Sequence, residues 1–265
     1  MTAVALSLSD AGTEEAFHAP NRVPEVTPAF WLIKLMAVTM GETAADYLAV
    51  NLGFGLTTTT LIMSTLLAVV LGWQFAQRRY VPHVYWLAVV LISIVGTLIT
   101  DNLVDNFGVA LTTTTWVFSL ALIGTFTAWY ASERTLSIHE VFTAKREAFY
   151  WLAILFTFAL GTAAGDLIAE HFGLGFLATG ILFAMVIGSL SAGYWKLGLD
   201  GLWAFWLCYI LTRPLGASFG DLLSQPAEFG GLGLGTIITS LCFLGVIAAT
   251  VLVISVRQGR GQIEA

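Results

Sequence analysis

Charge is scarce in this chain. Only 11% of its 265 residues are Asp, Glu, Lys or Arg, whereas 57% are hydrophobic. A water-soluble domain needs more polar sequence than this to cover its surface. The longest polar interruption after residue 28 spans residues 132–146, which leaves no room for a soluble catalytic domain. The composition therefore excludes an ordinary globular enzyme and predicts a polytopic membrane protein.

Three features that would point to a secreted or nucleic-acid-binding protein are also missing. Cys208 and Cys242 both lie in apolar segments, so we expect no disulfide framework and interpret both as buried packing residues. Residues 1–27 have neither a basic start nor a sustained apolar run, which favours a cytoplasmic tail over a cleaved signal peptide. The net charge of -6 is a poor guide to partners because much of the acid lies inside apolar segments, and we expect no nucleic-acid partner.

Apolar segments long enough to span a bilayer recur along the chain. About 20 helical residues cross a hydrocarbon layer of ~30 Å. The first members of successive pairs are predicted at 28–51, 84–106, 148–171 and 202–225, and the second members at 56–77, 111–130, 176–194 and 232–256. The sequence thus predicts an all-α fold with eight transmembrane helices, and segments this long and apolar exclude a closed barrel.

Lys and Arg fall on one side of these segments. All of the 11 except Lys34 and Arg213 lie before the first span, after the last, or in the loops after the second, fourth and sixth spans. The positive-inside rule then predicts that both termini are cytoplasmic. Each pair of spans would start and end in the cytoplasm, so the pairs would be hairpins of parallel orientation.

One motif is repeated in the first span of every pair. A Trp is followed by a Gly ten residues later and an Asp five residues after that, without any change of spacing. The four occurrences are Trp31, Gly41, Asp46; Trp86, Gly96, Asp101; Trp151, Gly161, Asp166; and Trp206, Gly216, Asp221. Such regularity indicates four related units.

The spacing of the units indicates two halves. The Asp positions 46, 101, 166 and 221 are separated by intervals of 55, 65 and 55 residues. We therefore predict two pseudo-symmetric halves related by an axis along the membrane normal. The predicted segments are a tail at 1–27, halves at 28–131 and 147–256, a cytoplasmic linker at 132–146 and a C-terminus at 257–265.

The Trp and Gly of the motif have structural interpretations. The Trp stands near the start of its span, which is typical of the aromatic belt at the headgroup level. The Gly lies about 15 Å deeper, where it would allow close helix packing or a break that exposes backbone carbonyls.

The Asp is the main functional candidate. A charged side chain inside a membrane costs ~2.5–3.5 kcal/mol on insertion scales, so four of them need compensation. Glu42, Asp105 and Glu170 lie four residues from a motif Asp and share its helix face, whereas Gln225 takes this place in the fourth unit. Such a cluster must bind protons, bind cations or be open to water. Alternatively, each Asp caps a neighbouring helix or bonds the Thr runs at 57–60 and 112–115.

Oxygen ligands favour hard cations, and Mn²⁺ is the leading prediction among divalent metals, with Na⁺ and protons as alternatives. His171 either completes such a site or is a solvated interface residue. Lys34 and Arg213, the two intramembrane cations, are interpreted as counter-ions or as a gating pair that a substrate cation displaces; Pro214 after Arg213 predicts a kink in the seventh span. The predicted ligands or proton carriers are Asp46, Asp101, Asp166 and Asp221, with Glu42, Asp105 and Glu170 in support.

The motif, with the Gly-containing turn and Thr-rich second span that follow it, resembles a family of bacterial inner-membrane proteins built from four tandem two-helix repeats of unknown function. The resemblance covers residues from about 23 to 256. It implies the eight-helix fold and a bacterial plasma membrane, and it carries no activity.

Two functions follow from the acids. The first is a membrane transporter or exporter of a hard cation, alone or in exchange for protons, whose partners are the lipid bilayer and a small cation. The alternative is a non-transporting scaffold or sensor with structural carboxylates. We expect no enzyme, because Gly165-Asp166 and Gly220-Asp221 lack the rest of the GxGD pattern of intramembrane aspartyl proteases.

Overall fold

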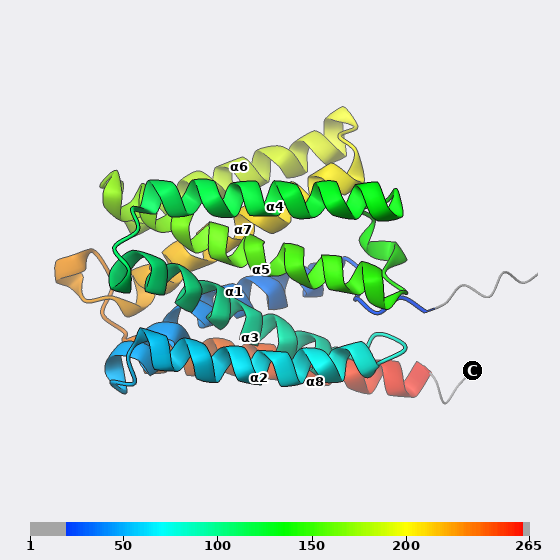
Figure 1. Cartoon of the computed structure of the whole chain (residues 1–265), viewed down its shortest axis with the longest axis horizontal. Helices are drawn as coiled ribbons and strands as arrows, with labels where there is room; N and C mark the ends of the chain where they lie inside the picture. The colour runs from blue at the N-terminus through cyan, green and yellow to red at the C-terminus, as the bar shows by residue number, and fades with distance from the viewer. Residues whose placement is uncertain (1–19, 262–265) are drawn as a thin grey trace, which may run out of the picture.

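The computed structural model describes residues 20–261, and within that range the chain is all-helical, without a β-strand (Figure 1). The predicted all-α class is therefore confirmed. The long helices are α1 (Pro28–Asp46), α2 (Leu56–Ala76), α3 (Pro82–Asp101), α4 (Leu111–Glu133), α5 (Ala144–Asp166), α6 (Phe176–Leu197), α7 (Gly201–Ser224) and α8 (Thr236–Gly261). Residues 1–19 and 262–265 of the predicted termini lie outside the described range.

Six of these helices are long and apolar enough to cross a membrane, namely α2, α3, α4, α5, α6 and α8. The other two, α1 and α7, carry charged residues along their length, including Lys34 and Glu42 in α1 and Arg213 in α7. These charges are buried inside the protein. The two long helices outside this set of six thus carry charges that face the interior of the protein.

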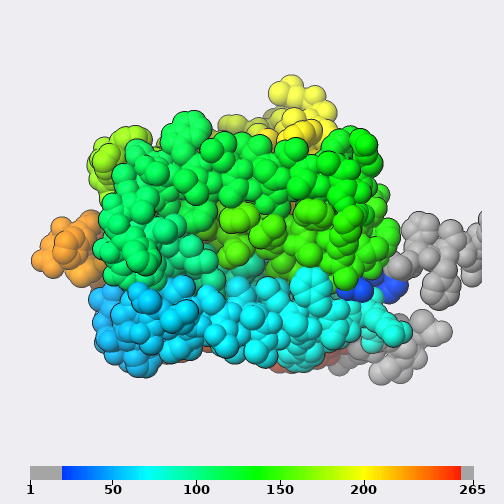
Figure 2. Space-filling view, viewed as in Figure 1, coloured from blue at the N-terminus to red at the C-terminus, as the bar shows by residue number. Residues whose placement is uncertain are grey.

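The helices run between two ends of the bundle. The turns at 47–55, 102–110, 167–175 and 225–235 lie at the end called here the acid end, on the left of Figure 1. The loops at 77–81, 134–143 and 198–200 lie at the opposite end, called here the entry end, together with residue 20 and the end of α8. In the space-filling view, the turn near residue 230 and the loop near residue 198 stand out from the body (Figure 2).

The odd-numbered helices form a closed inner ring. Helix α1 packs against α3 and α7, and α5 packs against the same two helices. The repeated glycines lie at these contacts. A Cβ added to Gly41 would lie 2.6 Å from Ser93 Cβ, one on Gly96 2.7 Å from Phe158 Cβ, and one on Gly216 2.9 Å from Val38 Cβ. Gly161 meets Arg213 and Pro214 in the same way. At all four junctions the glycine faces the residue three positions before the next glycine in the ring, so close packing is the role of this position.

The even-numbered helices cover this ring from outside. Each packs mainly on the inner helix of the next unit: α2 on α3, α4 on α5, α6 on α7, and α8 on α1. The two helices of one repeat are therefore joined by a turn but buried against different neighbours. This arrangement interlocks the units, because no repeat can bury its own apolar face alone.

The N-terminal segment 20–27 crosses the entry end of the bundle. Asn21 Nδ2 donates to Ile138 O at 2.8 Å, and Val141 N donates to Asn21 Oδ1 at 3.1 Å. Arg22 Nη1 donates to Glu147 Oε2 at 2.7 Å, and the Glu147 side chain is fully buried. This described part of the predicted tail is therefore packed onto the protein.

Two packing predictions were wrong. Trp86, Trp151 and Trp206 are buried rather than exposed at the headgroup level, because each packs between inner helices and donates its indole N–H to a protein oxygen. Cys208 is buried as expected, but Cys242 is exposed, because it lies on the outer face of α8.

Candidate functional site

The acidic motif residues belong to rows of side chains spaced four residues apart on the inner helices. Residues four apart lie on one helix face. Counted from the acid end, the rows are Asp46, Glu42, Val38, Lys34 and Phe30 on α1; Asp101, Thr97, Ser93, Val89 and Tyr85 on α3; Asp166, Thr162, Phe158, Ile154 and Tyr150 on α5; and Asp221, Ala217, Arg213, Tyr209 and Phe205 on α7. The Arg213 guanidinium touches one residue of each of the other three rows, namely Glu42, Thr97 and Thr162, so the four rows converge at this level of the ring.

The layer nearest the acid end consists of the four motif Asp residues. Asp221 is buried, and the other three are half-buried. Each of the four interacts electrostatically with Glu42, and Asp46 interacts with each of the other three. The four helices therefore bring their carboxylates near one another and near Glu42 at the acid end.

Little protein holds these carboxylates in place. Among the described residues, the only side chain that donates to one of the four is Gln225, whose Nε2 lies 3.3 Å from Asp46 Oδ2. The Thr runs bond elsewhere: Thr57 Oγ1 donates to Asn102 Oδ1 at 3.1 Å, and Thr59 and Thr115 donate to carbonyls of their own helices. The alternative in which each Asp bonds a Thr run is thus wrong for this structure.

The next layers contain a buried ion pair that joins all four inner helices. Arg213 Nη2 from α7 donates to Glu42 Oε2 from α1 at 2.7 Å and to Thr162 Oγ1 from α5 at 2.7 Å. It also donates to Thr97 from α3, whose hydroxyl lies 3.2 Å from Glu42 Oε2. Arg213 is fully buried, and its Nε and Nη1 have no hydrogen-bond partner among residues 20–261. The counter-ion that the sequence left unspecified for Arg213 is Glu42.

Lys34 lies one layer nearer the entry end and has no carboxylate partner among the described residues. Its Nζ donates to Tyr209 O at 2.6 Å and to the Thr212 hydroxyl, and it lies 4.0 Å from the centroid of the Tyr209 ring. Cation–π attraction and a backbone carbonyl compensate the buried ammonium in part.

Helix α7 continues unbroken past Pro214 to Ser224.

Aromatic side chains fill the axis at the entry end. The hydroxyl oxygens of Tyr85 and Tyr150 are 2.5 Å apart, and the rings of Phe30 and Phe205 have centroids 6.1 Å apart. All but Phe205 are buried to 2% exposure or less. The axis is therefore polar and partly accessible at the acid end and closed by aromatic rings at the entry end.

The supporting acids lie in different places. Glu42 is on the axis, whereas Asp105, Glu170 and His171 are exposed at the acid end. Within residues 20–261, no group of three or more His, Cys, Asp or Glu side chains has an arrangement that could hold a metal ion. The carboxylates are thus at one level without forming a closed metal-binding cluster in this conformation.

Three features of the axis were not predicted from the sequence. Thr97 and Thr162 were overlooked, although both follow a motif Gly directly, as Glu42 does, and an alignment of the four units would have found them. Three motif Asp residues are also followed at once by a π-helical turn, at Tyr47–Asn51, Asn102–Asn106 and Leu167–His171. π-Helical turns are frequent at functional sites. No residue pattern in the sequence predicted these three turns.

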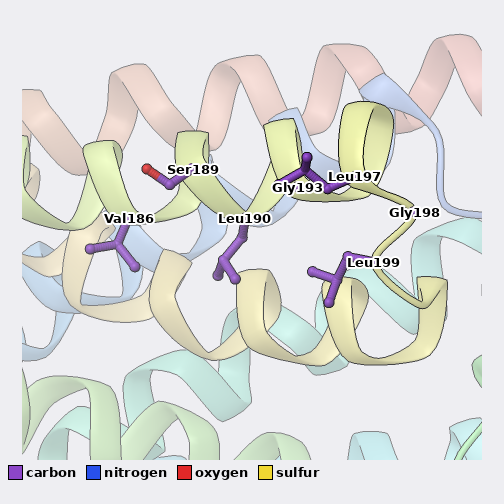
Figure 3. A pocket seen from close by; sticks show the side chains of 7 residues that line it. All are labelled: Val186, Ser189, Leu190, Gly193, Leu197, Gly198 and Leu199. Atoms are coloured by element: carbon purple, nitrogen blue, oxygen red, sulfur yellow. The ribbon is translucent and has the colours of Figure 1, made fainter.

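A small cavity of about 370 Å³ lies on α6 and the turn after it, away from the acids (Figure 3). It is lined by Val186, Ser189, Leu190, Gly193, Leu197, Gly198 and Leu199. It contains no titratable side chain, so it is not the candidate site.

These observations define a class: an all-helical protein of four tandem units, with six helices long and apolar enough to cross a membrane and four carboxylates on one internal axis. The chain belongs to the family described as Repeat of Unknown Function (DUF347), whose model matches residues 29–80, 84–135, 149–197 and 204–260. The predicted four-repeat family is thereby confirmed. No curated protein and no solved structure matches the chain.

Proposed function

We propose that this protein spans the inner membrane of a bacterium with eight helices and transports a hard cation along the axis of its inner ring. In this proposal α1 and α7 also cross the membrane, shielded by the outer helices, and the units are parallel hairpins in two pseudo-symmetric halves. The support is that the charges of α1 and α7 point into the protein, where lipid does not reach them. The distribution of Lys and Arg favours cytoplasmic termini.

The observation that carries the proposal is the layer of four motif Asp residues on one axis. Three of the four are half-buried, and in the part of the chain that the structure describes none of the four bonds a Thr run. Four carboxylates at one level attract and concentrate cations. Exposed Asp105 and Glu170 add negative charge at the same end of the axis.

The chemistry of the layer favours a hard cation. Its ligands are carboxylate oxygens, which suit Mn²⁺, Mg²⁺ or Ca²⁺ better than soft metals. Mn²⁺ is our first choice among divalent metals, and protons are the second. A proton would move between carboxylates, and in an exchange mechanism the two ions would compete for the same oxygens.

The experiment that tests transport uses purified protein reconstituted into liposomes that contain a Mn²⁺-sensitive dye or a pH-sensitive dye. We expect saturable entry of Mn²⁺ or protons that empty liposomes do not show. A control variant is Glu228→Gln, which changes an exposed carboxylate in the turn after α7. Folded wild-type protein that moves neither divalent cations nor protons contradicts the proposal.

One observation favours the alternative, a non-transporting scaffold or sensor. The Glu42–Arg213 pair ties α1, α3, α5 and α7 together, as a purely structural network would. A scaffold predicts that Asp46→Asn and Asp101→Asn change the yield of folded protein and produce no ion-dependent phenotype. The two functions are separated by growth of cells that carry these variants at raised metal concentrations.

A further inference from the structure

A second, larger cavity lies beside the axis at the entry end. It has a volume of about 1000 Å³ and is bounded by α1, α6, α7 and the loop between α4 and α5. Its wall is largely apolar, and the polar side chains on it include Ser137, His139, Ser191, Asp200 and Thr212. In Figure 1 the connection between α6 and α7 stands apart from the other loops at this end. The cavity is large enough to hold many water molecules.

A residue on the inner wall of this cavity is hydrogen-bonded to Lys34 on the axis. Thr212 lines the cavity, and its hydroxyl receives a hydrogen bond from Lys34 Nζ, which is itself fully buried. Lys34 and Arg213 both lie 5.7 Å from the centroid of the Phe158 ring, and Arg213 is paired with Glu42. A short series of contacts therefore leads from the cavity to Glu42, one turn below the Asp layer.

The repeats depart from one another at this place. At the position of Lys34 the other units have Val89, Ile154 and Tyr209, and at the position of Arg213 they have Val38, Ser93 and Phe158. The two charges that break the pattern thus lie on α1 and α7, the two inner helices that bound the cavity. An axis that ended at the aromatic layer would need no such asymmetry.

We propose that this cavity is the second mouth of the cation path, so that the path leaves the axis between α1 and α7, and that the Lys34 side chain is the barrier between them. This inference rests on the proposed function. The aromatic layer of Phe30, Tyr85, Tyr150 and Phe205 closes the straight route. An ammonium group at the inner end of an acidic path repels an arriving cation until Lys34 moves or loses its proton.

The groups that face Lys34 determine how it acts. Arg213 is the nearby like charge, Glu42 is paired with Arg213, and Tyr209 and Thr212 supply oxygen atoms from α7. No carboxylate among the described residues is bonded to Lys34, so a cation is kept out by the ammonium and not by an ion pair that it would have to break.

The first test measures whether the cavity reaches Thr212 from solvent. Thr212→Cys and Thr157→Cys are made in a chain with Cys208→Ser and Cys242→Ser, and membrane vesicles are treated with an impermeant thiol reagent. Thr157 is the matched control, because it occupies the Thr212 position on α5, is buried, and does not line the cavity. We expect Thr212→Cys to react at least about tenfold faster, from the face that exposes an N-terminal tag. Equal rates, or reaction from the opposite face, overturn the proposed mouth.

The second test measures the barrier. Lys34→Met removes the charge with similar volume, and Lys34→Arg keeps it. In liposomes we expect Lys34→Met to raise the passive leak of cations at least about tenfold, and Lys34→Arg to keep it near the wild-type level. Wild-type leak in folded Lys34→Met overturns the barrier. If Thr212→Cys is labelled but no variant moves any cation, transport itself is wrong while a cavity open to solvent stands, so the two failures are distinguishable.

Discussion

The two halves of the internal axis differ in how closely the four units agree. At the acid end every unit supplies an Asp, and the layer is identical around the ring. Two layers further in, the units supply Val38, Ser93, Phe158 and Arg213, whose side chains differ in size, polarity and charge. The outer layer thus has the symmetry of the repeats, and the inner layers have lost it.

The halves also differ in charge. The outer layer carries four carboxylates, whereas the inner layers carry Lys34, Arg213 and Glu42, a formal sum of 2 - 1 = +1. A symmetric negative layer suits the attraction of cations, a task in which each unit acts alike. An asymmetric positive region suits control of cation passage at one junction between inner helices. The four Asp residues, which all units share, should therefore be tested as a group, and Lys34, Arg213 and Glu42, which they do not share, should be tested individually.

The largest expected effect comes from breaking the inner ion pair. Glu42→Gln leaves the Arg213 guanidinium buried without a counter-ion, and removal of one partner of a buried pair costs about 3–5 kcal/mol. Equilibrium unfolding in detergent micelles measures this loss. The double variant Glu42→Gln with Arg213→Met removes both charges and should recover most of the stability. A single variant as stable as the wild type would show that the pair does not hold the ring together.

A smaller effect is expected from the glycine contacts that bring the four rows together. In Gly96→Ala, the added Cβ lies 2.7 Å from Phe158 Cβ and 3.1 Å from Ala159 N, so α3 and α5 must move apart. Overpacking of this kind costs about 1–3 kcal/mol of unfolding free energy. The control is Gly124→Ala on α4, where nothing lies within 4 Å of the new atom. The control should be neutral or stabilising, because Ala is the better helix former. Equal losses for both variants would contradict the close contact.

The smallest effect is expected for a charge outside the axis. Lys145 Nζ lies 3.2 Å from Glu133 Oε1, but the Lys145 side chain is 64% exposed, and Arg146 Nε also lies 3.0 Å from Glu133. Solvent screens such a pair, and Arg146 remains to bind the carboxylate. We expect Lys145→Ala to unfold at the same denaturant concentration as the wild type. A clear loss of stability would mean that the exposed Lys145–Glu133 pair stabilises the fold, which would contradict the expected difference from the buried Glu42–Arg213 pair.

The fold was largely predictable from the sequence. Apolar runs of the right length placed every helix, and the predicted boundary 28–51 coincides with α1 and its π-helical turn. The repeated Asp singled out the outer layer, because four acids in apolar sequence need an explanation. The packing order was not predictable. The apolar residues of α2 do not predict that it packs on α3 and not on α1, since its apolar surface fits either neighbour.

The inner layers were predictable only in part. Lys34 and Arg213 were predicted to be the two cations inside apolar segments, but pairing Arg213 with Glu42 depends on the close approach of α1 and α7, which Gly216 allows. The burial of Trp86, Trp151 and Trp206 was missed because the same ring suits an interface with lipid headgroups or the space between helices. In both cases the outcome depends on which helices are neighbours in the ring.

The central claim is that Asp46, Asp101, Asp166 and Asp221 act as one cation site. The most direct measurement is cation uptake into liposomes by the four single Asp→Asn variants, with Glu228→Gln as the control. We expect each of the four to lower uptake by a similar factor, about tenfold or more, and Glu228→Gln not to do so. Two substitutions together should lower uptake by less than the product of their separate factors. Uptake that depends on a single Asp, or on none of them, would contradict the central claim.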